Sequence, residues 1–181
     1  MLGETEMERS KLFRSLFEQV AKGRRWPEAI VAWAEDALGR GVDTPNLRVL
    51  AGLARGSLES EVSEYFLATL SELSQPPIAP EERALGVARV TANSIVTGET
   101  SPSEGVAVVH SVAVSPLGHP PTLQPWCDLH SGFRRAAGSS KVEFLGGAAL
   151  DDAIRELARE LLSGDMEEQL RAIRAWTTPG R

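Results

Sequence analysis

Short helices with clear start and stop signals are the feature that most limits what this chain can fold into. Apolar residues recur three and four positions apart in segment after segment, which is the spacing of one face of an α-helix. Prolines stand directly after Thr44 and Ser101, where the first turn of a helix tolerates the missing N–H. Gly23, Gly98 and Gly164 each follow the last apolar residue of a periodic segment. The sequence therefore predicts many helices of modest length joined by tight turns.

This pattern indicates an all-α protein, built as a single-domain helical bundle or a stack of helical hairpins with about eight or nine helices. The whole chain, 1–181, is expected to form that one domain, because 181 residues suit a single core. The valine-rich residues 106–114 are the weakest part of the prediction, since β-branched residues favour a strand. The capping box from Ser101 to Glu104 favours a helix there, and strand is the runner-up.

Residues 115–149 lack a clear period, and we expect a loop-rich segment. Prolines and glycines crowd its first part. Trp126, Leu129 and Phe133 indicate one or two short turns in the middle. The glycine- and serine-rich residues 136–147 are expected to be mobile and to be cut first by a protease.

Charge and composition exclude several classes of protein. The net charge is −6, which argues against a protein that binds nucleic acid through a basic face. No apolar run reaches the roughly 18 residues that a membrane span needs. Residues 1–10 do not resemble a secretion signal, and a single cysteine gives no internal disulfide. We therefore expect a cytoplasmic protein.

The residues with the most chemical potential gather in one window of the sequence. All three histidines, His110, His119 and His130, lie there together with Cys127. Zinc binds cysteine and histidine at spacings like that of Cys127 and His130, with further ligands from elsewhere. A cysteine beside a histidine also suits a thiol nucleophile with its base. A structural zinc site usually shows two tight ligand pairs and this chain shows one, so the sequence favours a packing role for Cys127 and assigns no metal, cofactor or catalytic residue.

The last helix of the chain is the best candidate for a protein-binding element. Its apolar stripe includes Leu170, Ile173 and Trp176. A helix this short must dock to be stable. It either closes the protein's own core, for example against Phe13 and Phe17, or binds another protein with tryptophan as the anchor.

The run Gly41–Leu53, which reads G-V-D-T-P-N-L-R-V-L-A-G-L, resembles a segment shared by small, uncharacterised helical proteins of GC-rich bacteria. The likeness extends over roughly residues 27–162 and includes an acidic helix at 59–73 and the turn Ile95–Gly105. The resemblance implies a helical bacterial protein. Those proteins have no established activity, so it implies no functional residues.

A non-catalytic bacterial protein-interaction module is the function that the sequence favours, as an adaptor, an immunity-type binder or a regulatory partner that acts through helical surfaces. Its partner would be another protein or a second copy of the chain, and neither nucleic acid nor a membrane. The alternative is a metal-binding or thiol enzyme centred on Cys127, His130 and His119. The sequence does not show whether these three side chains converge.

Overall fold

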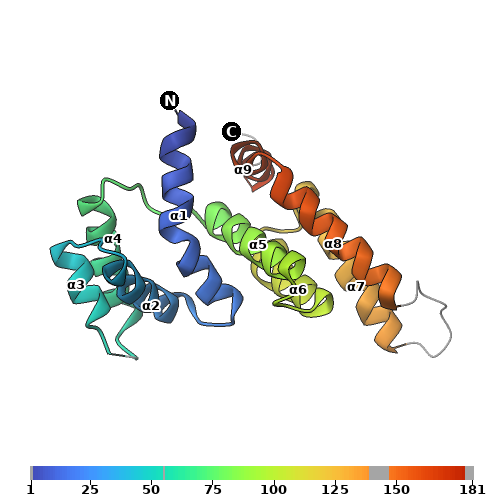
Figure 1. Cartoon of the computed structure of the whole chain (residues 1–181), viewed down its shortest axis with the longest axis horizontal. Helices are drawn as coiled ribbons and strands as arrows, with labels where there is room; N and C mark the ends of the chain where they lie inside the picture. Colours follow the sequence, from blue (N-terminus) through green and yellow to red (C-terminus); the bar gives the residue numbers. More distant parts are fainter. Residues whose placement is uncertain (1, 55, 139–146, 178–181) are drawn as a thin grey trace. The chain divides into compact units, whose positions relative to one another are not determined.

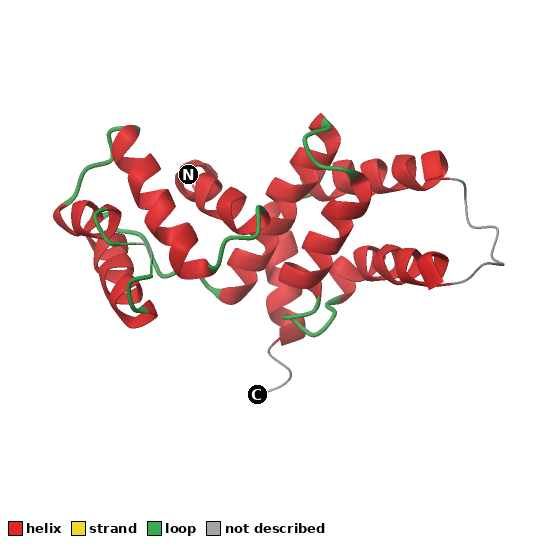
Figure 2. Ribbon diagram, turned by 90° about the horizontal axis from the view of Figure 1, so that it is seen from below, coloured by secondary structure: helices red, strands yellow, loops and turns green. Residues whose placement is uncertain are grey.

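The computed structural model describes residues 2–54, 56–138 and 147–177, and every structural statement below refers to these ranges. They contain nine α-helices and no strand (Figure 1, Figure 2), which confirms the all-α prediction. By its internal contacts the chain divides into two compact units, Met1–Ala79 and Pro80–Arg181. Each unit has its own core, and the expectation of a single domain stays a prediction.

Unit 1 packs its helices around aromatic rings. It consists of α1 (Leu2–Ala21), α2 (Trp26–Gly39), α3 (Pro45–Ala51) and α4 (Glu59–Glu72). The Trp33 ring lies 5.4 Å from that of Phe13 and 5.5 Å from that of Phe66, the second pair edge to face. Its indole N–H donates a 2.8 Å hydrogen bond to the Leu12 carbonyl. The buried tryptophan therefore joins α1, α2 and α4 with its polar atom satisfied.

Unit 2 holds the remaining helices around a second apolar core. It consists of α5 (Pro80–Thr97), α6 (Pro102–Val109), the π-helix η1 (His110–Val114), the 3₁₀-helix η2 (Pro121–Leu123), α7 (Gln124–Gly138), α8 (Gly147–Ser163) and α9 (Met166–Thr177). Side chains from α5, α6, α7, α8 and α9 meet in this core, among them Leu85, Val106, Trp126, Ile154 and Ile173. No described helix is long and apolar enough to cross a membrane.

The predicted helix starts at Thr44 and Ser101 are confirmed. The Thr44 hydroxyl accepts a hydrogen bond from the Leu47 amide at 3.4 Å. The Ser101 hydroxyl accepts one from the Glu104 amide at 3.4 Å and donates one to the Glu104 carboxylate at 2.6 Å. The bonds from the Leu47 and Glu104 amides satisfy groups that the first turn of a helix leaves unpaired.

The valine-rich residues 106–114 form a helix, as predicted, but its last five residues wind as a π-helix. The Ser115 amide donates to the His110 carbonyl at 2.9 Å, five residues back. Buried Val106, Val109 and Val114 pack in the core of unit 2. Burial thus outweighs the low helix propensity of valine. His110 lies where the α-helix changes to the wider π-helix.

The prediction of a loop-rich segment at 115–149 is wrong for residues 124–138, which form the helix α7. Trp126 is buried and Leu129 packs against the core, so one face of this segment is apolar after all. Pro125 stands in the first turn, where proline is tolerated. The expected mobility of residues 136–147 falls largely on residues 139–146, which lie outside the described ranges.

Candidate functional site

Three side chains that the sequence singled out converge in unit 2. The ligand atoms of His110, His119 and Cys127 all lie within 4.8 Å of one another. The Cys127 sulfur and the His119 Nδ1 are 3.4 Å apart. We call these three residues the His/Cys cluster. Among the described residues it is the group of His, Cys, Asp and Glu side chains whose ligand atoms lie close enough together to share one metal ion.

Each member of the cluster comes from a different local structure. His110 opens the π-helix η1, and Cys127 lies in the first turns of α7. His119 lies between η1 and η2 with a φ of 60°, in the left-handed region that non-glycine residues seldom adopt. Backbone in this region is often held in place for a function. Here it ends the chain reversal that brings His119 back to α7.

The spacing of the cluster is close to what zinc requires. Zinc binds imidazole nitrogen at about 2.0–2.1 Å and thiolate sulfur at about 2.3 Å, so tetrahedral ligand atoms stand roughly 3.5 Å apart. The sulfur of Cys127 and Nδ1 of His119 already have this separation, at 3.4 Å. Drawing in His110 needs a movement of roughly an ångström, within the reach of a side-chain rotation. The cluster therefore suits a transition-metal ion with two imidazole ligands and one thiolate ligand.

His130 lies against the cluster but is not one of its three members. Its ring stacks on that of His110, with centroids 3.9 Å apart and planes 14° apart. His130 follows Cys127 by one helical turn on α7, which puts both side chains on the same face of the helix. Stacking holds the His110 ring in a fixed plane, which is the orienting role that neighbours of metal ligands commonly play.

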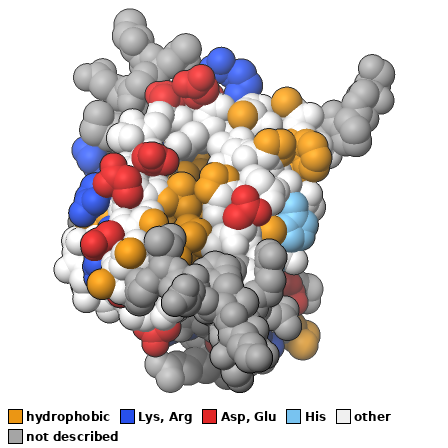
Figure 3. Space-filling model, turned by 90° about the vertical axis from the view of Figure 1, so that its right-hand side faces the viewer, with side chains coloured by type: hydrophobic (Ala, Val, Ile, Leu, Met, Phe, Trp, Pro, Cys, Tyr) orange, Lys and Arg blue, Asp and Glu red, His pale blue; other side chains and the backbone are white. Residues whose placement is uncertain are grey.

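The cluster lies at the edge of unit 2. His119 is exposed, while His110 and Cys127 are half-buried. Cys127 also packs against the core, as the sequence analysis predicted for it. Histidine atoms, drawn in pale blue, reach the surface in Figure 3. An ion or a small molecule can therefore approach the cluster from solvent.

The protein-binding residues proposed from sequence divide between core and surface. Leu170 and Ile173 are buried, at 4% and 0% exposure, in the core of unit 2. This is the core-closing role, one of the two interpretations that the sequence analysis gave for the last helix. Trp176 remains 48% exposed, and its indole N–H donates to the Gly118 carbonyl at 3.1 Å.

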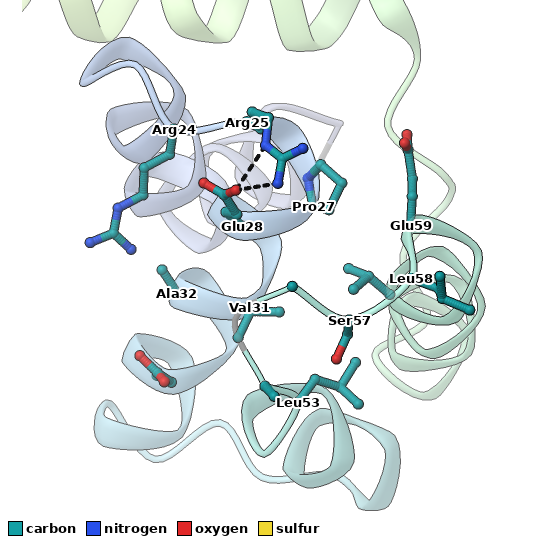
Figure 4. A pocket seen from close by; sticks show the side chains of 14 residues that line it. Arg24, Arg25, Pro27, Glu28, Val31, Ala32, Leu53, Ser57, Leu58 and Glu59 are labelled. Atoms are coloured by element: carbon teal, nitrogen blue, oxygen red, sulfur yellow. Dashed lines mark hydrogen bonds and ion pairs between the residues drawn. The ribbon is translucent and has the colours of Figure 1, made fainter.

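A hollow lies in unit 1, between α2 and the connection from α3 to α4 (Figure 4). Its volume is about 630 Å³. Val31, Leu53 and Val62 form part of its wall, and Arg25 pairs with Glu28 across its rim (Figure 4). Charges of both signs line it, and one pair is already made. The hollow therefore favours no charged class of ligand.

No family model, no curated protein and no solved structure matches this chain. The resemblance of residues 41–53 stays a prediction. The proposals below rest on the chemistry and geometry of the chain itself.

Proposed function

We propose that this chain binds a transition-metal ion, zinc by preference, through His110, His119 and Cys127. The observation that carries the proposal is the convergence of the three ligand atoms within 4.8 Å of one another. Two imidazoles and a thiolate are borderline-soft ligands that suit zinc better than magnesium or calcium. This reverses the preference of the sequence analysis, which could not place the three side chains together.

A thiol nucleophile assisted by His119 would use the same 3.4 Å contact. That alternative leaves His110 without a part in the chemistry. Metal binding uses all three side chains and also accounts for the stacking of His130, which steadies His110. Metal binding therefore explains more of the site.

The test is a titration of chelator-treated protein with Co²⁺, which reports a thiolate ligand by a charge-transfer band in the near ultraviolet. We expect a single ion per chain and the loss of that band in Cys127→Ser. His119→Ala should weaken Co²⁺ binding at least about ten-fold, because substituting even the residues that hydrogen-bond to metal ligands lowers metal affinity by that factor. A circular dichroism spectrum of the chelated protein checks the prediction from sequence that the fold forms without metal.

His130→Phe is the matched control, because phenylalanine keeps a ring that can stack on His110 and removes the nitrogens. We expect this variant to bind Co²⁺ nearly as well as the unchanged protein. Absence of the charge-transfer band in the unchanged protein, or an identical band in Cys127→Ser, would contradict the proposal.

A second candidate function is the interaction role, now centred on Trp176 alone. The exposed ring forms part of the wall of a shallow hollow, together with Pro116, Leu117 and Ala175. This apolar patch is the same on every copy, so two copies can bring their patches together about a two-fold axis. The occupant that we propose is therefore a second copy of the chain.

Analytical ultracentrifugation tests this second proposal. We expect Trp176→Ala to weaken self-association strongly, because tryptophan is a frequent anchor of interfaces. Leu67→Ala is the control, since Leu67 is also an exposed apolar residue, at 51%, but lies on α4 of unit 1. A monomer at all concentrations for the unchanged protein would exclude the second copy.

A further inference from the structure

The loop between η1 and η2 connects the His/Cys cluster to the end of α9. Two adjacent residues in this loop have different partners. The His119 ring contacts the Cys127 sulfur, and the Gly118 carbonyl accepts the hydrogen bond from the Trp176 indole. Because a single peptide unit joins Gly118 to His119, a displacement of one residue displaces the other.

This part of the loop is held in a fixed shape. Gly118 and His119 both have left-handed backbone, with φ of 69° and 60°. The His119 amide donates to the Val114 carbonyl at 3.0 Å, and the Gly118 amide to the Ser115 carbonyl at 3.2 Å. Leu117 anchors the turn in the core with 9% exposure. These hydrogen bonds and the buried Leu117 side chain fix the backbone of Gly118 and His119 relative to η1.

Within the described ranges, two long-range side-chain hydrogen bonds hold the end of α9, and one of them goes to this loop. The first is the bond from the Trp176 indole to Gly118, at 3.1 Å. The second is the bond from the Thr177 hydroxyl to the Glu81 carboxylate on α5, at 3.0 Å. These neighbouring contacts make it possible to loosen the end of α9 with or without disturbing the loop.

We propose that metal binding at the His/Cys cluster is coupled, through the loop 115–119, to the docking of the C-terminal turn of α9. The inference rests on the proposed metal-binding function. An ion that holds His119 also holds the Gly118 carbonyl in place for the Trp176 indole. By linkage the effect is reciprocal: the docked Trp176 raises metal affinity, and the metal stabilises the docked end of α9. The metal thereby controls how the exposed tryptophan ring is presented at the surface.

The test compares Co²⁺ affinity in the unchanged protein, Trp176→Phe and Thr177→Val. Trp176→Phe keeps an aromatic ring and removes the indole N–H. We expect it to weaken Co²⁺ binding by a factor of about 2 to 10, the range that the loss of one net hydrogen bond produces. Thr177→Val removes the bond to Glu81 but keeps the indole bond to Gly118, so we expect it to weaken Co²⁺ binding much less than Trp176→Phe does. Hydrogen exchange of the α9 amides should slow by a comparable factor when metal is added, and this slowing should vanish in Trp176→Phe.

The possible outcomes distinguish this inference from the metal-binding proposal on which it rests. If the unchanged protein gives no Co²⁺ charge-transfer band, the metal-binding proposal itself fails. If the band forms and Trp176→Phe binds as tightly as the unchanged protein, with α9 exchange insensitive to metal, the coupling is refuted and metal binding stands. Equal weakening in Trp176→Phe and Thr177→Val would also refute it, because the effect would then come from general loosening of α9.

Discussion

Gly105 lies where α6 packs closely against α5 in unit 2. A Cβ atom added there would collide with both Cδ1 and Cγ1 of Ile95 on α5, and would touch Thr91 Cγ2 at 3.5 Å. Ile95 is buried, with 1% exposure, so it has little room to move aside. The missing side chain of Gly105 is what lets α6 pack against α5.

We expect Gly105→Ala to lower the free energy of unfolding by about 1–3 kcal/mol, the usual cost of overpacking a core. Urea unfolding followed by circular dichroism measures the change. Gly39→Ala is the control, because a Cβ at Gly39 meets nothing within 4 Å. That variant should be neutral or slightly more stable, since alanine restricts the unfolded chain. Equal stability of the two variants would show that α5 and α6 can separate at little cost.

At the residue scale, the sequence singled out the candidate site residues but did not show that their side chains meet. Cys127, His119 and His130 stand out by type and spacing alone. Their meeting depends on the wider turn at η1 and on the left-handed backbone at His119, and neither has a local sequence signal as strong as a cap. His110, a marginal candidate in the sequence, proves to be the third member of the cluster, while His130 stacks behind it.

Arg89 ties the elements α5, α8 and α9 together, and the sequence analysis missed it. From α5 its guanidinium donates to the carbonyls of Leu161, Leu162 and Gly164 and to the Gln169 side chain, at 2.8–3.0 Å. A cation at the C-terminus of α8 also interacts favourably with the helix dipole. Burial lowers the pKa of the Arg89 guanidinium below its usual range, with a nearby Asp165 opposing the shift. One side chain thus completes the end of α8 and the turn into α9.

Arg89→Met should lower the free energy of unfolding by about 2 kcal/mol, because several backbone carbonyls lose a charged donor at once. Thermal and urea unfolding both report it. Arg155→Met provides the comparison, since the Arg155–Asp152 pair is a surface ion pair with the aspartate 79% exposed. Such pairs contribute about 0–1 kcal/mol. A loss from Arg89→Met no larger than that from Arg155→Met would mean that water replaces the guanidinium without cost.

At the element scale, the helices with a polar cap followed by proline were predicted well, and α7, which has no such cap, was not. Thr44 and Ser101 begin α3 and α6 as expected. The helix α7 was missed because prolines and glycines surround it, and only burial of Trp126 and Leu129 reveals its apolar face. The stripe of α9 was recognised, but periodicity cannot separate a face that enters the protein's own core from one that binds a partner.

For the whole molecule, the sequence was enough to predict the helical class. The sequence analysis did not predict the division into two units. The boundary between the two units falls after Ala79, inside the segment 75–80 that contains three prolines. Its three prolines prevent a helix from continuing through it. Length alone had suggested a single core. Periodicity shows which face of a helix is apolar, whereas the choice of neighbour depends on side-chain shape across elements distant in the sequence.

The π-helix at His110–Val114 makes the proposed metal site sensitive to the loss of a single residue from the chain. Each residue of a regular α-helix advances the next by about 100° around the axis. Deleting one residue between Ser111 and Val114 would restore regular geometry and swing the helix before it, with His110, by about that angle relative to Cys127. Every histidine and cysteine would remain, yet the ligands would no longer meet. A single-codon deletion here is therefore expected to abolish the proposed metal site although no ligand is replaced.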